Sequence, residues 1–361
     1  MSYCFNPDCQ KPQNIADAEN CSSCGSKLLL SPSISLREIK SEAALKELEI
    51  PLAFRYRAIK PIGQGGFGRT FLAVDENKSF SYSHCVIKQF FPHNSSPEKA
   101  AELFHQEAMQ LETLGKHPQI PELLAHFEQD GQQYLVQEFI AGKNLAEELA
   151  QKGAFNEILI RQLLQDLLPV LHFVHKSKVI HRDIKPENII RRTHPYQGGI
   201  TGFIPILPTD LGTSQPSVLP GFARDNQLVL VDFGAAKKVT GNGLPQTGTI
   251  IGSAAYTAPE QLMGKAVFAS DIYSLGVTCI HLLTEVPPFD LFDSREGAWA
   301  WRDYLKVPVS DNLGDILDKM LQGATNRRYH AAGAIIRHLN PKPVYLETLA
   351  GTPESAMPAA G

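Results

Sequence analysis

The sequence predicts an α+β protein in which strands and helices are segregated along the chain, preceded by a small metal-binding module. Alternating apolar and polar residues favour strands between residues 54 and 140. Apolar residues at helical spacing predict a long helix over 157–176. Four cysteines lie within the first 24 of the 361 residues. A strand-rich segment followed by a helix-rich one is typical of α+β folds.

The composition is that of a folded protein and excludes several classes. Hydrophobic residues make up 43% and charged residues 20% of the chain, and the formal net charge of −4 gives no overall reason to expect nucleic acid. No apolar run approaches the roughly 18 residues needed to span a bilayer, and the start, MSYCFNPDCQ, lacks the regions of a signal peptide. We therefore expect a cytoplasmic protein without a membrane span.

The clustered cysteines form a C-x4-C pair and a C-x2-C pair with eleven residues between them. Such spacings are within or near those that let four thiolates surround one Zn²⁺. A reducing cytosol disfavours two disulfides, while a redox role and unbound thiols remain open. The prediction is a structural zinc site in a zinc-ribbon-like module over residues 1–30, with Cys4, Cys9, Cys21 and Cys24 as ligands.

A linker over residues 31–53 follows, with one short amphipathic helix. The first 30 residues carry two lysines against three acidic residues, which gives little support to nucleic-acid binding. We expect the cysteine module to contact a protein partner or to sense redox state.

The segment FRYRAIKPIGQGGFGRTFLAVDE contains a glycine cluster between two alternating patterns. Gly63, Gly65 and Gly68 form G-x-G-x-x-G, a weak signal alone. The β-branched and apolar residues after Gly68 favour a second strand, whereas a dinucleotide-binding turn would lead into a helix. A strand-turn-strand with exposed backbone amides can lie over phosphates. The lack of G-x-x-x-x-G-K-[ST] argues against a P-loop NTPase.

The next strand pattern, HCVIKQF, holds a candidate phosphate ligand. Alone, Lys88 would be interpreted as a solvated edge residue. The helical pattern over 97–115 places Glu107 near its middle, so we predict a buried Lys88–Glu107 pair that holds the ammonium for a nucleotide's α- and β-phosphates. The strand and helix predicted over 133–153 suit a hinge where adenine bonds backbone groups around Glu138.

Two further stretches predict a metal-assisted site. In VIHRDIKPENII, a tight loop can direct three polar groups into one site. The carboxylate suits a hydroxyl, the ammonium suits a γ-phosphate and the amide suits a metal. The apolar run LVLV ends in Asp232, at a turn where it can hold Mg²⁺. The helix before them contains Pro169, which should kink or interrupt it.

With the glycine loop, Lys88, Glu107, H-R-D-x-K-x-x-N, D-F-G at 232–234 and A-P-E at 258–260 in this order, the chain resembles the eukaryotic-type (Hanks-type) serine/threonine protein kinases. The resemblance covers roughly residues 54–340 and implies a bilobal fold with a small β-rich N-lobe and a larger helical C-lobe. The preceding cysteine module makes the chain similar to a group of cyanobacterial serine/threonine kinases.

The resemblance implies a role for each matching position. Asp183 would be the catalytic base, Lys185 the γ-phosphate contact, and Asn188 and Asp232 the ligands of Mg²⁺ or Mn²⁺. The residues expected to bind ATP are Ile62, Gly63, Gln64, Gly65, Gly66, Phe67, Gly68, Thr70, Lys88, Glu107 and Glu138.

Two structural roles are also implied. Asp271 in SDIYSLGV would bond the catalytic-loop backbone. Glu260 would pair with an arginine near the end of the domain, and Arg328 fits better than the adjacent Arg327. Departures from the family pattern are Thr70 and Cys85, each where the motif usually has valine; both are small enough to be accommodated.

Regulation is implied by four positions. Ser253 in GSAAYTAPE matches a position that favours serine and threonine over tyrosine as acceptors. Arg182 precedes the catalytic aspartate, which in this family often accompanies control by activation-loop phosphorylation. Thr247 and Thr249 are then candidate sites, since a phosphate there could pair with that arginine.

The two metal-binding motifs are unusually far apart. The family usually joins them by a hairpin of about a dozen residues, whereas 43 residues separate Asn188 from Asp232. The insertion over 193–226 is tolerated because closure entropy grows slowly with loop length. It is either a mobile surface excursion or a docking surface for substrate or for the zinc module, built on Phe203, Ile204, Ile206 and Leu207. Residues 341–361 are expected to form a flexible tail.

The function expected is transfer of the γ-phosphate of Mg-ATP to serine or threonine hydroxyls of protein substrates, in bacterial signalling. The alternative is a catalytically weak scaffold with a kinase fold, whose zinc module mediates protein binding or redox sensing. The presence of Lys88, Asp183, Asn188 and Asp232 favours catalysis.

Overall fold

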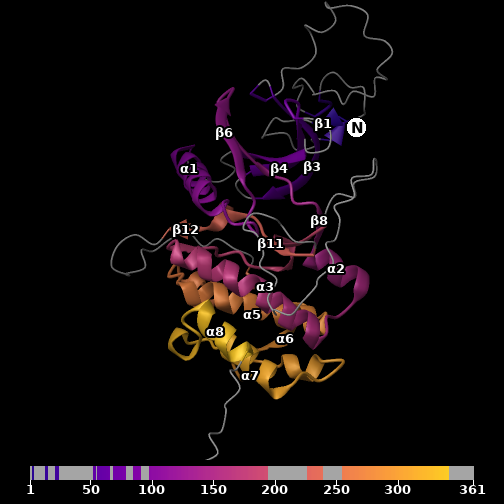
Figure 1. Cartoon of the computed structure of the whole chain (residues 1–361), viewed down its shortest axis with the longest axis vertical. Helices are drawn as coiled ribbons and strands as arrows, with labels where there is room; N and C mark the ends of the chain where they lie inside the picture. Colours follow the sequence, from indigo (N-terminus) through magenta and orange to yellow (C-terminus); the bar gives the residue numbers. More distant parts are fainter. Residues whose placement is uncertain are drawn as a thin grey trace, which may run out of the picture.

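A five-stranded antiparallel sheet forms the smaller lobe of the protein, in the upper part of Figure 1. The computed structural model describes residues 2–3, 13–14, 21–23, 52–53, 55–65, 68–78, 84–90, 97–193, 226–238 and 254–340. The sheet order is β3-β4-β5-β7-β6, and helix α1 (Pro97–Leu114) lies beside it. The strands are β3 (Tyr56–Gly65), β4 (Gly68–Asp75), β5 (His84–Phe90), β6 (Leu123–Gln129) and β7 (Gln132–Glu138).

The alternating pattern predicted for these strands is realised in their burial. Every second residue of β4 is buried, including Phe71 and Ala73, and the residues between them are partly exposed. These two pack with Tyr56, Ile87 and Val136 into a core of the sheet. The sheet thereby holds β5, which carries Lys88, between β4 and β7.

Helices form the larger lobe and contain the main hydrophobic core. Helix α3 (Glu157–Lys176) begins at the N-cap Asn156, whose side chain accepts a hydrogen bond from the N–H of Leu159. The expected interruption at Pro169 does not occur: α3 is continuous, and the proline lies on its exposed side. Helix α5 (Phe268–Thr284) is buried along most of its length, as expected for a central helix. Together with the sheet lobe, these helices confirm the predicted α+β architecture.

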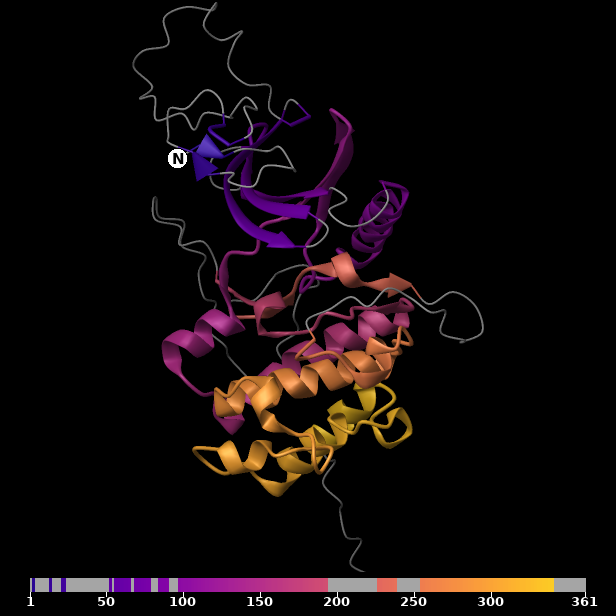
Figure 2. The same ribbon diagram turned by 180° about the vertical axis from the view of Figure 1, so that it is seen from behind.

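Short elements between the lobes carry the catalytic motifs. Strand β10 (Ile189–Arg192) lies between β11 (Leu228–Leu230) and β8 (Gly142–Asn144), and all pairings are antiparallel. The view from behind shows these strands and the segment leading to β12 (Lys237–Lys238) lying below α1 and above α3 (Figure 2). The ladder therefore brings Asn188, just before β10, close to Asp232, just after β11.

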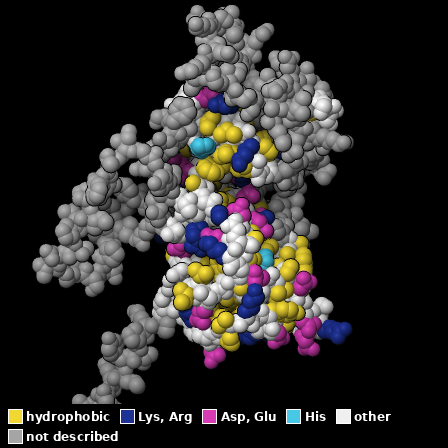
Figure 3. Space-filling view, turned by 90° about the vertical axis from the view of Figure 1, so that its right-hand side faces the viewer, with side chains coloured by type: hydrophobic (Ala, Val, Ile, Leu, Met, Phe, Trp, Pro, Cys, Tyr) yellow, Lys and Arg dark blue, Asp and Glu magenta, His cyan; other side chains and the backbone are white. Residues whose placement is uncertain are grey.

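The remaining elements complete the helical lobe. These are α2 (Leu145–Lys152), β9 (Val179–Ile180), η3 (Pro186–Asn188), η4 (Phe233–Ala235), α4 (Pro259–Leu262), α6 (Pro288–Leu291), β13 (Phe292–Asp293), β14 (Ala298–Trp299), η5 (Trp301–Tyr304), α7 (Asp311–Met320), η6 (Thr325–Arg327) and α8 (Ala332–Leu339). On the face shown in Figure 3, acidic and basic side chains are interspersed over this lobe, so neighbouring charges offset each other. Among the described helices, none is long and apolar enough to cross a membrane.

Several predicted features fall outside the described residues. These are the helix of the linker, most of the insertion, the tail, and the side chains of Cys4, Cys9 and Cys24. Two short strands, β1 (Ser2–Tyr3) and β2 (Gln13–Asn14), pair antiparallel in the cysteine-containing segment. Cys21 is buried, and its sulfur accepts a hydrogen bond from the N–H of Ser23 at 3.4 Å.

Candidate active site

Lys88 connects the two lobes at the centre of the site. Its Nζ atom lies 2.6 Å from Glu107 Oε1 on α1 and 2.7 Å from Asp232 Oδ1. The side chain of Glu107 is only 2% exposed, which confirms the predicted buried pair. Burial opposes the ammonium form, but the charges of Asp232 and Glu107 outweigh it and raise the pKa of Lys88 above its usual range. Lys88 is therefore a cation held between Glu107 and Asp232.

Asp232 adopts a conformation that few residues other than glycine adopt. Its φ is 66° and its ψ is 75°, and its Oδ1 atom accepts from the N–H of Gly234 at 3.4 Å. The positive charge of Lys88 lowers the pKa of this carboxyl to about 2, so it is ionised at neutral pH. The side chain is 46% exposed, which leaves the carboxylate accessible to a ligand. The geometry suits a group that holds a cation.

The catalytic loop brings together the three polar side chains predicted from HRDIKPEN. Lys185 Nζ lies 2.9 Å from Asp183 Oδ2. The amide nitrogen of Asn188 donates to the carbonyl oxygen and to Oδ2 of Asp183, both at 2.8 Å. The amide nitrogen of Asn188 is thus used to hold Asp183, which leaves its amide oxygen as an acceptor.

A buried aspartate on α5 holds the backbone of this loop. Asp271 accepts from the N–H groups of His181 and Arg182, each at 2.9 Å, as the sequence predicted. His175, at the end of α3, lies 2.8 Å from the same carboxylate. Burial opposes the carboxylate form, but these hydrogen bonds outweigh it and lower the pKa of Asp271. They also support Arg182 in a left-handed conformation, with φ 68°.

Hard oxygen ligands are available where a metal was predicted. Asp232 Oδ2 makes no ion pair or hydrogen bond with the described residues, and Asn188 lies five residues after Asp183 in the same loop. A carboxylate and an amide oxygen fit Mg²⁺ or Mn²⁺, which prefer oxygen ligands. The residues present therefore fit the metal that the resemblance implies.

The glycine loop has one position where only glycine fits. A Cβ on Gly68 would lie 2.0 Å from the carbonyl oxygen of Gln89, because β4 and β5 approach closely there. Thr70 pairs with Gly63 on one side and with Lys88 on the other, so it links the loop to the lysine. Ile62 is 48% exposed and open to a ligand. The backbone of Gln64 and Gly65 continues β3, whereas Gly66 and Phe67 lie outside the described residues.

The predicted hinge residue serves as an anchor. The N–H of Glu138 donates to the carbonyl oxygen of Glu122 at 2.8 Å, and its Oε1 lies 2.8 Å from Arg192 Nη1. This ion pair links the end of β7 to the end of β10. Bonding of adenine around Glu138 stays a prediction.

The arginine that pairs with Glu260 is Arg328. Its Nη1 atom lies 2.7 Å from Glu260 Oε1 and 2.8 Å from the carbonyl oxygen of Ala269. The side chain of Arg328 is fully buried, whereas Arg327 is exposed. The preference for Arg328 over Arg327 is confirmed, and the pair ties helix α4 to the end of the lobe.

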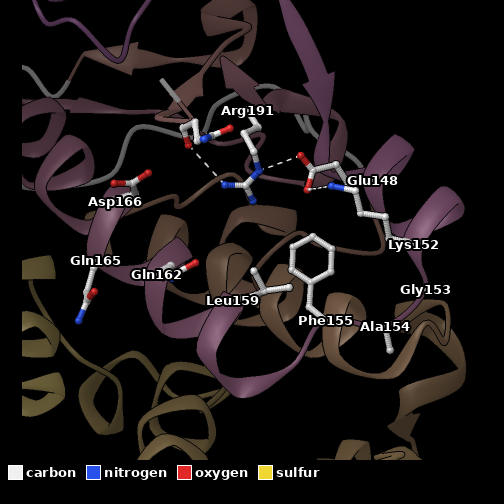
Figure 4. A pocket seen from close by; sticks show the side chains of 11 residues that line it. Glu148, Lys152, Gly153, Ala154, Phe155, Leu159, Gln162, Gln165, Asp166 and Arg191 are labelled. Carbon is white, nitrogen blue, oxygen red and sulfur yellow. Dashed lines mark hydrogen bonds and ion pairs between the residues drawn. The ribbon is translucent and has the colours of Figure 1, made fainter. Parts of the chain in front are cut away.

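A separate pocket of about 580 Å³ lies beside α2 and α3, away from these motifs (Figure 4). Arg191 of β10 reaches into it, with Nε 2.8 Å from Glu148 Oε1 and Nη1 3.4 Å from the carbonyl oxygen of Asn226. Phe155 and Leu159 form the apolar wall below the arginine (Figure 4). The pocket thus lies where the insertion leaves and rejoins the hairpin.

Among the expected regulatory residues, the structure describes only Arg182. Its Nε atom donates to the carbonyl oxygen of Ala235, at 2.5 Å, so it contacts the segment after Asp232. Thr247, Thr249 and Ser253 lie outside the described residues. Within the described part of the chain, no group of three or more His, Cys, Asp or Glu side chains is arranged to hold a metal.

Three functional contacts were missing from the sequence interpretation. Gln110 and Gln261 each donate a buried hydrogen bond to the backbone near Asp232 or Asp183, and His175 lies against the carboxylate of Asp271. The partners are far away in sequence, so no local pattern marks them. For Gln110 and His175 the available signal was a polar residue in a predicted helix, whereas no helix was predicted around Gln261.

Comparison with known proteins agrees with this geometry. The protein kinase domain family matches residues 56–339. Serine/threonine-protein kinase B of Synechocystis sp. is 34% identical over 377 residues, covering 100% of this chain and 56% of the relative. Serine/threonine-protein kinase C of the same organism is 38% identical, covering 79% and 49%. Serine/threonine-protein kinase PknA of Nostoc sp. is 36% identical, covering 79% and 47%.

The chain spans about half the length of these curated relatives. The family match nevertheless extends from the first strand of the sheet lobe to the last helix of the larger lobe. It therefore includes every motif of the site described above, and the chain belongs to the protein kinase family.

Proposed function

We propose that the protein transfers the γ-phosphate of ATP to serine or threonine hydroxyls of protein substrates. The observation that carries this proposal is the placement of Lys88 between Glu107 and Asp232, which is the arrangement that phosphoryl transfer by kinases requires. The cyanobacterial relatives are serine/threonine-protein kinases by name, which supports the same acceptor class and a role in bacterial signalling.

The side chains divide the work of the reaction. Mg-ATP supplies the phosphoryl group and, through its metal, neutralises charge that develops on the phosphates. Asn188 and Asp232 would hold the metal, and Lys88 would contact the α- and β-phosphates. Asp183 would orient the acceptor hydroxyl and accept its proton, with Lys185 offsetting charge beside it.

The catalytic aspartate provides the test of this proposal. Purified protein, radiolabelled ATP and a generic basic protein substrate should give labelled product, and Asp183→Asn should abolish it. Asp290→Asn is a matched control, because Asp290 is an exposed aspartate on α6, and it should retain full labelling. Equal labelling by wild type and Asp183→Asn would refute the assignment.

We also propose that phosphorylation of Thr247 or Thr249 regulates the enzyme, and that Ser253 contributes to its preference for serine and threonine over tyrosine as acceptors. The support is the position of Arg182 beside the segment that leads toward these residues. Mass spectrometry after incubation with ATP should find phosphate on one of the two threonines. A fully active enzyme that carries phosphate on neither residue would contradict this proposal.

We further propose that Cys4, Cys9, Cys21 and Cys24 hold one structural Zn²⁺ in a module over residues 1–30, which binds a protein partner. The support is the paired spacing of the four thiols. Metal analysis of the purified chain should find about one zinc per molecule. Freshly reduced protein with no zinc would rule the site out and favour a redox role.

A further inference from the structure

Three buried side chains on separate elements each donate a hydrogen bond to a backbone carbonyl of a catalytic segment. Gln110 Nε2 lies 3.2 Å from the carbonyl oxygen of Ala236. Arg182 Nε donates to the carbonyl oxygen of Ala235, and Gln261 Nε2 lies 2.7 Å from the carbonyl oxygen of Arg182. We call Gln110, Arg182 and Gln261 the carbonyl brace. It runs from α1, through the segment after η4 and the catalytic loop, to α4.

Gln110 is a buried polar residue on the side of α1 that faces the site. Its side chain is 5% exposed, and its Oε1 atom makes no hydrogen bond with the described residues. A buried polar atom without a partner is unfavourable, and an apolar side chain of the same length would avoid it. What glutamine adds is the donor to Ala236. This is expected if the position of that carbonyl matters to the site.

Helix α1 carries two links to the site on one face. Glu107 and Gln110 are three residues apart, so they lie one above the other. Glu107 holds Lys88, and Gln110 holds Ala236, four residues after Asp232. A displacement of α1 therefore breaks both links together, which makes the placement of Asp232 depend on the position of the helix.

At the other end of the brace, Gln261 supports a strained residue. Arg182 has φ 68°, a conformation unfavourable for a residue with a Cβ, and it directly precedes Asp183. Its N–H is held by Asp271 and its carbonyl oxygen by Gln261, so both peptide groups of the strained residue are fixed. Gln261 lies next to Glu260, which Arg328 anchors.

We propose that Gln110 and Gln261 are positioning residues for phosphoryl transfer: they keep Asp232 and Asp183 in their catalytic places by holding the carbonyls of Ala236 and Arg182. The inference rests on the proposed kinase activity. It concerns placement rather than binding, because the hinge elements that would hold adenine are not part of the brace.

The kinetic test removes only the donors. Gln110→Met and Gln261→Met have similar length and no N–H, and each should lower kcat about 3- to 10-fold, the range expected from one hydrogen bond. The KM for ATP should change less than twofold. Gln106→Met, one turn earlier on α1 in a residue that bonds exposed Glu102, is the matched control and should keep wild-type kcat.

A conservative variant separates positioning from packing. In Gln110→Glu the carboxylic acid can donate to Ala236 only when protonated, so activity relative to Gln110→Met should be restored at low pH and lost as the pH rises. Wild type and Gln106→Glu should show no such step. A Gln110→Glu profile parallel to that of wild type would overturn the proposal.

Hydrogen exchange without substrate distinguishes this proposal from the kinase activity itself. The amide of Ala236, which donates to Phe233, should exchange faster in Gln110→Met, while amides of α3 stay as protected as in wild type. This change in a protein that shows no labelling activity would support the brace and refute the kinase function. Wild-type exchange at Ala236, or a loss of protection that includes α3, would refute the brace.

Discussion

Lys88 and Asp232 are 144 residues apart in the chain, yet Lys88 Nζ lies 2.7 Å from Asp232 Oδ1. The contact crosses from the sheet lobe to the segment that follows β11. Because Glu107 holds the same ammonium from α1, three elements meet at one cation. The position of α1 is thereby coupled to Asp232.

Removing the charge of Glu107 should weaken this coupling. In Glu107→Gln, Lys88 loses a buried charge-assisted hydrogen bond, worth about 1.5–3 kcal/mol, so kcat/KM should fall about 10- to 100-fold. Steady-state kinetics with a peptide substrate would measure the loss. Glu112→Gln changes an exposed glutamate of the same helix and should have no effect. Equal activity of the two variants would show that the ion pair is dispensable.

The adjacent arginines near the end of the domain offer a matched stability test. Arg328 is fully buried against Glu260, and removing one partner of a buried pair costs about 3–5 kcal/mol because the other charge stays behind. Urea unfolding of Arg328→Met should show a loss of this size. Arg327→Met alters an exposed residue and should stay within about 0.5 kcal/mol of wild type. A larger loss of stability in Arg327→Met than in Arg328→Met would mean that the Arg328–Glu260 pairing is wrong.

The glycine loop provides a second matched pair. A Cβ at position 68 would overlap the carbonyl oxygen of Gln89 at 2.0 Å, so Gly68→Ala must displace β4 or β5. We expect a loss of about 1–3 kcal/mol in the free energy of unfolding, together with weaker nucleotide binding. At Gly63 the nearest atom would be Thr70 Cβ, at 3.7 Å, and Gly63→Ala should fold normally. Thermal unfolding of both variants with and without ATP would reveal the difference.

The sequence predicted contacts that follow from a motif and its spacing. The Lys88–Glu107 pair, the bonding of Asp271 to the catalytic loop and the choice of Arg328 over Arg327 are all confirmed. In each case a charged residue needed a partner. The helical pattern supplied Glu107 as the partner of Lys88, and the resemblance supplied the partners of Asp271 and Glu260. Such residues can be predicted because burial of an unpaired charge is so unfavourable.

Contacts made by neutral side chains could not be predicted in this way. Gln110 and Gln261 bind backbone carbonyls, which are present at every residue, so no partner residue is specified by sequence.

The role of Glu138 as the partner of Arg192 was also missed, because their contact depends on how β7 and β10 are placed in space. Pro169 was expected to disturb α3, but the helix continues through it, since tertiary packing of the opposite face stabilises the helix.

Acidification should destabilise the fold through His117. Its Nδ1 atom accepts a hydrogen bond from the N–H of Gln119, and its ring lies against Phe173 with centroids 4.9 Å apart. Burial lowers the pKa of His117 below the value of about 6.5 that it has when unfolded. The unfolded chain therefore takes up a proton first, so this stability is present above about pH 6.5 and is lost as the pH falls.

Urea midpoints at pH 7.5 and 5.5 would measure this dependence. His117→Asn keeps a side-chain acceptor for the N–H of Gln119 without a titrating group, so its midpoint should decrease less between the two pH values than that of wild type. His172→Asn changes an exposed histidine on α3 and should leave the wild-type decrease intact. Identical decreases in all three proteins would exclude His117 as the source.

Deleting residues 195–222 should leave catalysis toward a generic substrate within about twofold of wild type. The hairpin closes without the insertion: the N–H of Arg192 donates to the carbonyl oxygen of Gln227, the N–H of Asn226 donates back to Arg192, and three residue pairs join β10 to β11. These bonds hold Asn188 and Asp232 at the ends of one ladder. Shortening the loop changes the entropic cost of closing it only slightly. Labelling of a generic protein and of a native substrate would be compared in parallel. If only labelling of the native substrate is lost, the insertion is a docking surface. If labelling of both substrates is retained, the insertion is a surface excursion. If labelling of both is lost, the ladder does not suffice to hold the metal ligands.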